Sequence, residues 1–468
     1  MNFIVYDVVF LVLFTLLVAL FLYTRKHNLK REGLLYLYRT KVGLQLIEWT
    51  SKKYAPILRP LQYVAIASGY ILMLAMIWLL AKLSYHYITS PSLAQQLRVP
   101  VITPLIPYID KLFAVDFLPP FYFTYWIIII AIIAIPHEFA HGIFARFSKV
   151  KIHSTGFGFL GPFLAAFVEQ DEKQMNKAKK FDQLAILAAG TFANVLMTIL
   201  FAVILFLFIA AVFIPAGVYF NTYAASTLTI EDIAMVDGIP LNQAERYLSA
   251  SNETLVSLKT TSGSRYFVAP ATLSQTLSEQ LPAITVYDDA PALNARLRGA
   301  ITQIDSVPVT SYEELRSALA SHNPGENITL TTKDDAGKEQ HFHIVLAGRA
   351  GESYLGIGIV PMQARGVRGL VYKAIGTVHN PLVYYESRLG EFGIFIYDLL
   401  WWIVVINISV ALCNMLPVGI FDGGRFFYLT VWGLTGSEKA ALRTFKASTW
   451  IILALVTLLM VKWFWVIF

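Results

Sequence analysis

The chain has 468 residues, of which 56% are hydrophobic, and its mean hydropathy of +0.58 is too high for a soluble globular protein. The net charge of +6 is concentrated in short loops beside apolar runs, so it does not require a nucleic-acid partner. The single cysteine, Cys413, excludes an internal disulfide framework. Composition therefore predicts a polytopic membrane protein.

Six apolar segments are each long enough, at about 20 residues, to cross a hydrocarbon core of about 30 Å. They cover residues 3–23, 62–84, 121–147, 184–214, 393–417 and 448–467. The first segment lacks a basic start and a small-residue cleavage site, so we interpret it as a retained span rather than a signal peptide. The expected fold is a polytopic α-helical membrane protein with about six transmembrane helices.

The orientation follows from the loop between the first two spans. Residues 24–61 contain nine lysines and arginines against two glutamates, which is typical of a cytoplasmic loop. Alternation from there places loops 148–183 and 418–447, which are also basic, inside. The N-terminus, the C-terminus and residues 215–392 are then expected on the extracytoplasmic side.

The third span contains an H-E-x-x-H pattern at residues 137–141, after an uncharged run from residue 121 to residue 135. On a helix, His137 and His141 project from one face and can bind one cation, with Glu138 beside them. Zinc requires neutral imidazole ligands and an open position for water, and Glu138 is placed to accept the proton of that water. A third protein ligand must come from elsewhere in the chain.

The stretch between the fourth and fifth spans, residues 219–360, is polar and rich in turns. Within it, the alternating runs 328–331 and 341–345 flank an Asp-Asp-Ala-Gly turn at 334–337, which predicts a β-hairpin. We expect a soluble domain inserted between two spans.

Part of this insert, residues 290–315, resembles a PDZ domain in its order of small-residue helix start, glycine turn, strand, turn and second helix. PDZ domains bind extended peptides or chain ends by strand addition. An earlier stretch, 233–241, resembles the strand and turn at 301–309. It is either a second, degenerate unit or a strand of the same, possibly permuted, domain.

The candidate for the third metal ligand is Asp422, just after the fifth span. That span runs in the same direction as the third, and the histidines lie toward the cytoplasmic end, so the depths match. Pro417 and Gly419 would break the helix and let Asp422 turn back into the bundle. Asp7 and Asp398 lie near the outer ends of their spans and fit less well.

The H-E-x-x-H pattern is followed by Asn414-x-x-Pro417-x-x-x-x-Asp422-Gly423, with the PDZ-like insert between them. This order resembles the site-2 protease family of intramembrane zinc metalloproteases, over residues 121–214, the insert and residues 393–430. The resemblance implies a role for each motif residue. Zinc would be held by His137, His141 and Asp422, Glu138 would be the general base, and Asn414 would support the substrate or the transition state.

Two further stretches fit this resemblance. Residues 156–169 resemble the re-entrant β-hairpin that guides the substrate, and the fourth span contains Gly190-Thr191-Phe192-Ala193-Asn194, with threonine where proline is usual. Asn194 would join Asn414 in supporting substrate or transition state, although either asparagine could instead hydrogen-bond between helices. The first two spans fall outside the family's shared core and are interpreted as lineage-specific additions.

The resemblance implies a zinc metalloendopeptidase that hydrolyses peptide bonds within or near the transmembrane segment of protein substrates. The expected divisions are residues 1–120, 121–214, 215–365, 366–447 and 448–468, with the PDZ-like insert third. A catalytically inactive scaffold that binds extracytoplasmic peptides is the alternative, and Glu138 argues against it because a structural site needs no base. A zinc transporter is disfavoured because the spans contain no second cluster of ligands.

Overall fold

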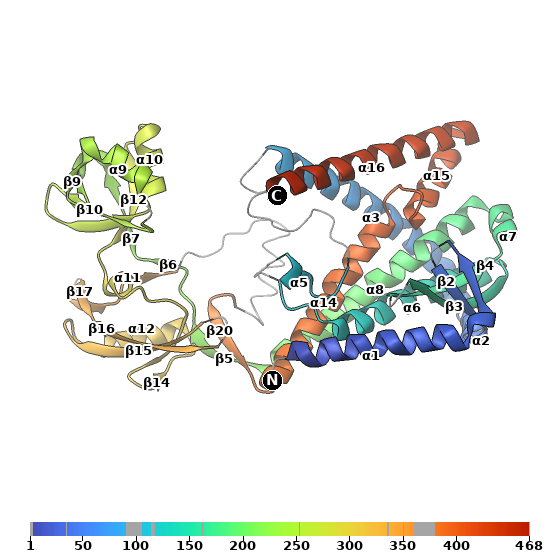
Figure 1. The fold of residues 1–468 in the computed structure, drawn as a ribbon, viewed down its shortest axis with the longest axis horizontal. Coiled ribbons are helices and arrows are strands. Elements are labelled where there is room, and N and C mark those ends of the chain that lie inside the picture. Colours follow the sequence, from blue (N-terminus) through green and yellow to red (C-terminus); the bar gives the residue numbers. More distant parts are fainter. Residues whose placement is uncertain are drawn as a thin grey trace. The chain divides into compact units, whose positions relative to one another are not determined.

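A computed structural model describes residues 3–33, 35–89, 105–113, 118–160, 163–251, 253–334, 337–349, 351–359 and 380–467. The chain divides into two compact units, the first formed by Met1–Leu205 with Phe395–Phe468 and the second by Phe206–Ile394. The first unit consists of helices and one sheet, and the second consists mostly of strands (Figure 1).

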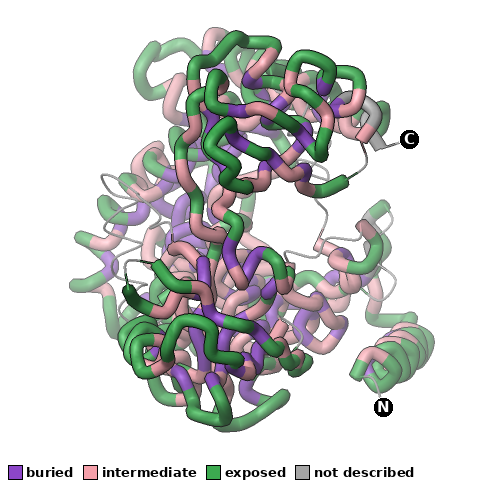
Figure 2. Tube along the Cα trace, turned by 90° about the vertical axis from the view of Figure 1, so that its left-hand side faces the viewer, coloured by how far each residue is buried: buried purple, intermediate pink, exposed green. Residues whose placement is uncertain are grey.

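Six helices of the described chain are long and apolar enough to cross a membrane. They are α1 (Phe3–Thr24), α3 (Ala55–Thr89), α6 (Phe123–Phe147), α8 (Lys180–Val212), α14 (Glu391–Asn414) and α16 (Glu438–Ile467). Each overlaps one predicted span, so the expected helical membrane fold is confirmed. Most of α1 is coloured as exposed in Figure 2. Its apolar residues include Leu13 and Leu16, which are 55% and 60% exposed, as expected for contact with lipid.

The core of the first unit lies where α3, α6, α8 and the helix α15 (Asp422–Thr435) meet. Ala65, Ala145, Ala188 and Phe426 are fully buried there, one from each helix. Gly69 of α3 permits this close packing, because a Cβ at that position would lie 3.2 Å from atoms of Ala188 and Phe426. Although interpreted as an addition, α3 is therefore an integral part of this core.

The first unit also contains an antiparallel sheet of order β1-β2-β3-β4. Its strands are β1 (Leu29–Glu32), β2 (Leu35–Thr40), β3 (Ile152–Leu160) and β4 (Phe163–Gln170). The pairing of β3 with β4 confirms the hairpin predicted at 156–169. The pairing of β2 with β3 was not predicted, and it needs Gly156, where a Cβ would lie 2.2 Å from the Tyr38 carbonyl oxygen. Strand β4 is left at an edge, packed against α6 (Figure 1).

The described part of the first unit also contains three short helices, namely α2 (Leu44–Lys53), α5 (Ile109–Leu112) and α7 (Glu172–Lys177). The predicted basic loop between the first two spans thus contains a hairpin and α2. Helix α2 packs along the last turns of α6, with Ile47 fully buried.

The second unit contains two separate six-stranded sheets, each with its own hydrophobic core. The first sheet is formed by β7 (Ala225–Thr229), β8 (Ile233–Val236), β9 (Ile239–Pro240), β10 (Val256–Thr260), β11 (Arg265–Val268) and β12 (Ala283–Asp288), with helices α9 (Ala244–Ala250) and α10 (Pro270–Ser278). The second is formed by β5 (Phe213–Val218), β13 (Ala300–Ile304), β14 (Val307–Pro308), β15 (Asn327–Lys333), β16 (Glu339–Val345) and β20 (Val383–Ser387), with α11 (Pro291–Asn294) and α12 (Tyr312–Ala320). Two strand pairs, β17 (Ala347–Arg349) with β18 (Glu352–Tyr354) and β6 (Thr222–Tyr223) with β19 (Ile357–Gly358), lie outside these sheets.

The hairpin predicted around residues 334–337 is confirmed by the pairing of β15 with β16. The central residues of its turn, 335 and 336, lie outside the described chain. The end of the expected insert, residues 360–365, lies outside it too.

The two sequence stretches that resemble each other form matching hairpins in the two sheets. Asp237 and Asp305 occupy equivalent turns, each with a positive φ of 45° and each followed by a second residue of positive φ. The Asp237 amide donates to the Ser257 carbonyl and the Asp305 amide to the Thr329 carbonyl, both at 2.9 Å. The strand amides of Ser257 and Thr329 donate back to Oδ1 of these aspartates. The earlier stretch therefore belongs to a separate sheet within the second unit rather than to the same sheet.

Candidate metal centre

Helix α6 presents two imidazoles one turn apart. His137 and His141 are 7% and 6% exposed, and their Nε2 atoms lie 3.0 Å from each other. Both rings face α8 at Gly190, where a Cβ would lie 2.3 Å from His141 Nε2 and 2.6 Å from His137 Nε2. Glycine at this position leaves the space in which both nitrogens converge.

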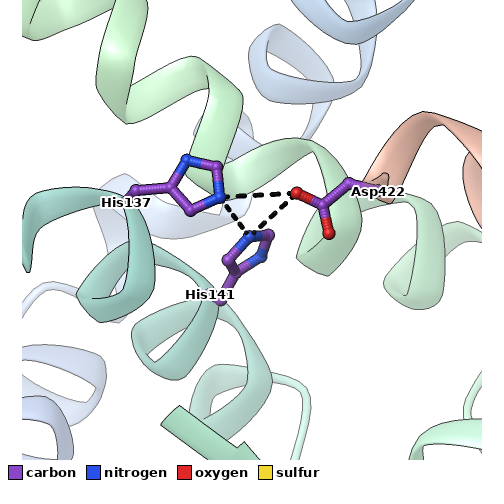
Figure 3. A group of neighbouring side chains, drawn as sticks. All are labelled: His137, His141 and Asp422. Atoms are coloured by element: carbon purple, nitrogen blue, oxygen red, sulfur yellow. Dashed lines mark hydrogen bonds and ion pairs between the residues drawn. The ribbon is translucent and has the colours of Figure 1, made fainter. Parts of the chain in front are cut away.

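Asp422 reaches the same point from the chain reversal that follows α14. Helix α14 ends at Asn414 and α15 begins at Asp422, so the break predicted from Pro417 and Gly419 is confirmed. Gly423 and Gly424 let α15 start close to this reversal, because Cβ atoms there would lie within 2.4 Å of the carbonyl oxygens of Met415 and Val418. Oδ2 of Asp422 lies 3.4 Å from His137 Nε2 and 3.3 Å from His141 Nε2 (Figure 3).

The second nitrogen of each ring is held by α8. Nδ1 of His141 donates to the Ile186 carbonyl at 2.7 Å, so in the neutral ring Nε2 carries the lone pair that a metal ion requires. The Asn194 side-chain nitrogen lies 3.1 Å from His137 Nδ1, while its buried Oδ1 has no partner within the described chain. The oxygen and nitrogen of an asparagine amide are assigned from their hydrogen bonds. With the Asn194 amide turned over, Oδ1 accepts from Nδ1–H of His137.

These contacts test whether the site suits a metal ion. Two imidazole nitrogens and one carboxylate oxygen converge, and a cation bound among them would satisfy all three. Their separations of 3.0 to 3.4 Å match the spacing of about 3.3 Å expected between ligands of a tetrahedral zinc ion. Within the described chain, this is the group of three histidines or carboxylates that could hold a metal ion. The donor set fits zinc with one position left open.

A cavity of about 500 Å³ opens beside the three donors. Glu138 and Asn414 line it together with the histidines and Asp422. Oε2 of Glu138 accepts a hydrogen bond from the Val168 amide of β4 at 3.0 Å, so the edge strand borders the same space. Asn194 is buried behind His137 and is not part of this lining.

The model of Peptidase family M50 matches residues 125–459, a range that includes all three donor residues. This chain belongs to Peptidase family M50. It is an intramembrane zinc metallopeptidase, and the expectations of enzyme class, zinc and a multi-pass membrane protein are confirmed. Among curated proteins, none matches this M50 chain.

The structure adds residues to this M50 site that the sequence did not indicate. The Val168 amide and the Ile186 carbonyl are backbone groups, for which a sequence carries no signal. Arg425 also lines the cavity, and its Nη2 donates to Asn176 Oδ1 at 2.5 Å. The sequence could have indicated Arg425, because a residue three positions after Asp422 lies on the same face of α15.

Asp7 and Asp398 were the weaker candidates for the third ligand. Neither belongs to the metal-binding group of this M50 site or lines its cavity. Asp398 is buried in α14. Asp7 of α1 accepts hydrogen bonds at the first turn of α6, far along that helix from His137.

Proposed function

We propose that this peptidase cleaves membrane-protein substrates within or near a transmembrane segment, with zinc held by His137, His141 and Asp422. The proposal rests on one observation, that the Glu138 carboxylate and the three converging donors line the same cavity. Zinc bound there would lower the pKa of a water molecule and polarise the scissile carbonyl.

The protein side chains supply the proton transfers and the orientation. Glu138 is assigned as the general base that accepts the proton of the attacking water and returns it to the leaving amine. Asn414, on the cavity wall, can donate a hydrogen bond to the carbonyl oxygen as negative charge develops on it. Asn194 is assigned to the orientation of His137, because its amide contacts Nδ1 rather than the cavity.

The substrate is expected to bind as an extended strand. A peptide bond within a helix has its carbonyl oxygen engaged and covered, so the segment must unwind before attack. Strand β4 offers the unwound segment an edge that is not paired with any other strand of the described chain, and its Val168 amide donates to Glu138 in the cavity. Pairing with this edge would use the re-entrant hairpin in the way the sequence resemblance implies.

The two sheets of the second unit are assigned as PDZ-like modules on the extracytoplasmic side. The assignment is supported by their matching hairpins at Asp237 and Asp305, each followed by a helix and a strand pair. The basic loop at 24–61 supports the orientation. Such modules could bind a peptide ligand, filter substrates by size or sense a substrate tail.

Zinc content and cleavage of a transmembrane-helix reporter test the proposal in detergent. The native chain should hold about one zinc per chain and cleave. Glu138→Gln should retain zinc and lose about 10²–10⁴-fold in kcat, since a general base contributes that much. Asp422→Ala should lose both zinc and cleavage.

The matched control is Glu279→Gln, which changes an exposed glutamate of the insert and should behave as native. Full zinc in Asp422→Ala would remove that residue from the site. Native cleavage by Glu138→Gln would contradict its role as base. A zinc-free native chain would favour the scaffold alternative.

A further inference from the structure

A buried carboxylate in the first helix is not used by the catalytic site. Asp7 is 1% exposed and is the single charged residue in α1, which is otherwise apolar. An ionised carboxylate at such a position is costly unless several donors satisfy it. The structure supplies four donors, all from residues outside α1.

Three of these donors belong to the first turn of α6. Oδ2 of Asp7 accepts from the Phe123 amide at 2.7 Å, and Oδ1 accepts from the amide and the hydroxyl of Thr124 at 2.9 and 2.5 Å. The fourth is the Tyr108 hydroxyl at 2.7 Å. The first amides of a helix have no partner within the helix, and a negative charge there is stabilised by the helix dipole.

Helix α6 has no cap of its own. Its N-cap residue, Tyr122, makes no side-chain hydrogen bond to the first turn, and that turn contains no acidic residue. Asp7 therefore caps α6 from another helix. Aromatic contacts reinforce the junction, since the Phe123 ring lies 5.5 Å from the Phe10 ring and 5.4 Å from the Phe14 ring.

The other end of α6 is held by the same N-terminal segment. Glu48 of α2 accepts from Arg146, in the last turn of α6, at 3.0 Å. Between these ends, Gly43 packs so closely on the Phe139 ring, inside the H-E-x-x-H pattern, that a Cβ there would lie 2.4 Å from it. The segment from α1 to α2 thus contacts the start, the metal-binding turn and the end of α6.

We propose that Asp7 is a positioning residue for the metal centre, which caps α6 from α1 and so fixes the helix that carries His137 and His141. The inference rests on the proposed metal site and adds to it a helix outside the family match, which begins at residue 125. Helix α1 is then a required part of the catalytic core.

The test compares Asp7→Leu, Tyr122→Ser and the double variant Asp7→Leu/Tyr122→Ser in the full chain. Serine at 122 can cap α6 from its own N-cap position and so replace the missing carboxylate. Val9→Leu, at a 52% exposed position of the same helix, is the matched control. Three quantities are measured: hydrogen exchange of residues 121–127, the affinity for Co²⁺ from its visible absorption, and kcat/KM on a helix reporter.

Asp7→Leu should lose at least tenfold in protection of the Phe123 and Thr124 amides, in Co²⁺ affinity and in kcat/KM. In the Tyr122→Ser background, adding Asp7→Leu should cause only a small part of each of these losses, because the serine at position 122 already caps α6. Val9→Leu should behave as native. Native Co²⁺ affinity in an Asp7→Leu chain that has lost amide protection would overturn the inference, as would the absence of recovery in the double variant.

One further variant, Asp7→Ala, covers the case in which Asp7→Leu does not fold. If Asp7→Leu yields no folded protein, recovery of Co²⁺ binding in the double variant supports the inference. Failure of that recovery, with native Co²⁺ binding by Asp7→Ala, which has no capping oxygen, overturns it. If no reporter is cleaved by the native chain, the proposed function is in question, while Co²⁺ affinity and hydrogen exchange still decide the role of Asp7.

Discussion

Gly190 occupies a position where any other side chain would place a carbon atom against both imidazoles. The metal centre therefore requires glycine at this position of α8 as well as the three ligand residues. Second contacts on the same helix, from the Ile186 carbonyl and the Asn194 amide, hold the distal ring nitrogens. Such outer contacts fix the ring orientation that a metal ion requires.

Replacing Gly190 with alanine should abolish stable zinc binding, because the added carbon would lie 2.3 Å from His141 Nε2. Gly433→Ala is the matched control, since no heavy atom of the described chain lies within 4 Å of a Cβ there. Zinc content after dialysis measures both. The Gly190 variant should fall to a small fraction of one zinc per chain, and the control should stay native. Equal zinc in the two would show that the histidines do not converge beside Gly190.

At the scale of elements, the two modules of the insert contain the same type of hairpin, but the aspartate in its turn has a different side-chain partner in each module. Asp237 accepts a hydrogen bond from the Tyr247 hydroxyl, whereas Asp305 accepts from His322 Nε2 at 3.0 Å. His322 Nδ1 also contacts the Ala318 carbonyl, at 2.8 Å, at the C-terminal end of α12. The hydrogen bond to Ala318 and the Asp305 carboxylate raise the pKa of His322 above its ordinary value.

This raised pKa predicts a pH dependence for the second module. A group whose pKa is higher in the folded state stabilises it below the unfolded pKa, and this contribution is lost as pH rises through the folded pKa. The opening free energy of α12, from hydrogen exchange corrected for intrinsic rates, should therefore decrease as pH rises above about 6.5, the ordinary pKa of histidine. His322→Gln should remove the decrease. A decrease of equal size in that variant would assign the effect to another group.

At the scale of the whole molecule, all residues of the metal centre belong to the first unit, and the insert belongs to the second. The insert begins and ends in paired strands. β5 and β20 are antiparallel, and the Tyr219 amide donates to the Leu382 carbonyl beyond their last pair. The chain therefore leaves and returns to the helices through two paired strands, β5 and β20, at one end of the second sheet.

Excision of residues 220–381, with a short Gly-Ser linker joining β5 to β20, should leave zinc binding intact. The reason is that every donor and every outer contact of the centre lies outside the excised range. Zinc content and cleavage of a short reporter measure the result. If the modules filter substrates by size, reporters with a large extracytoplasmic part that the native chain rejects should also be cleaved. Loss of zinc on excision would show that the insert supports the centre directly.

The sequence determined the local features of this protein. Hydropathy placed the six spans because the bilayer fixes their length, and the i, i+4 spacing placed His137 and His141 on one face. The helix-breaking residues before Asp422 indicated the reversal that returns this carboxylate to the bundle. Each of these signals lies within one segment, or in two segments of matching depth.

The tertiary structure decided the contacts between segments far apart in the sequence. These include the cap from Asp7 to Phe123, the pairing of β2 with β3, and the approach of Gly190 to both imidazoles. None has a local pattern, because a backbone amide, a glycine or a lone acid acquires its role from the partner that folding brings beside it. The sequence therefore determined which groups could perform the chemistry, and packing decided how they are held.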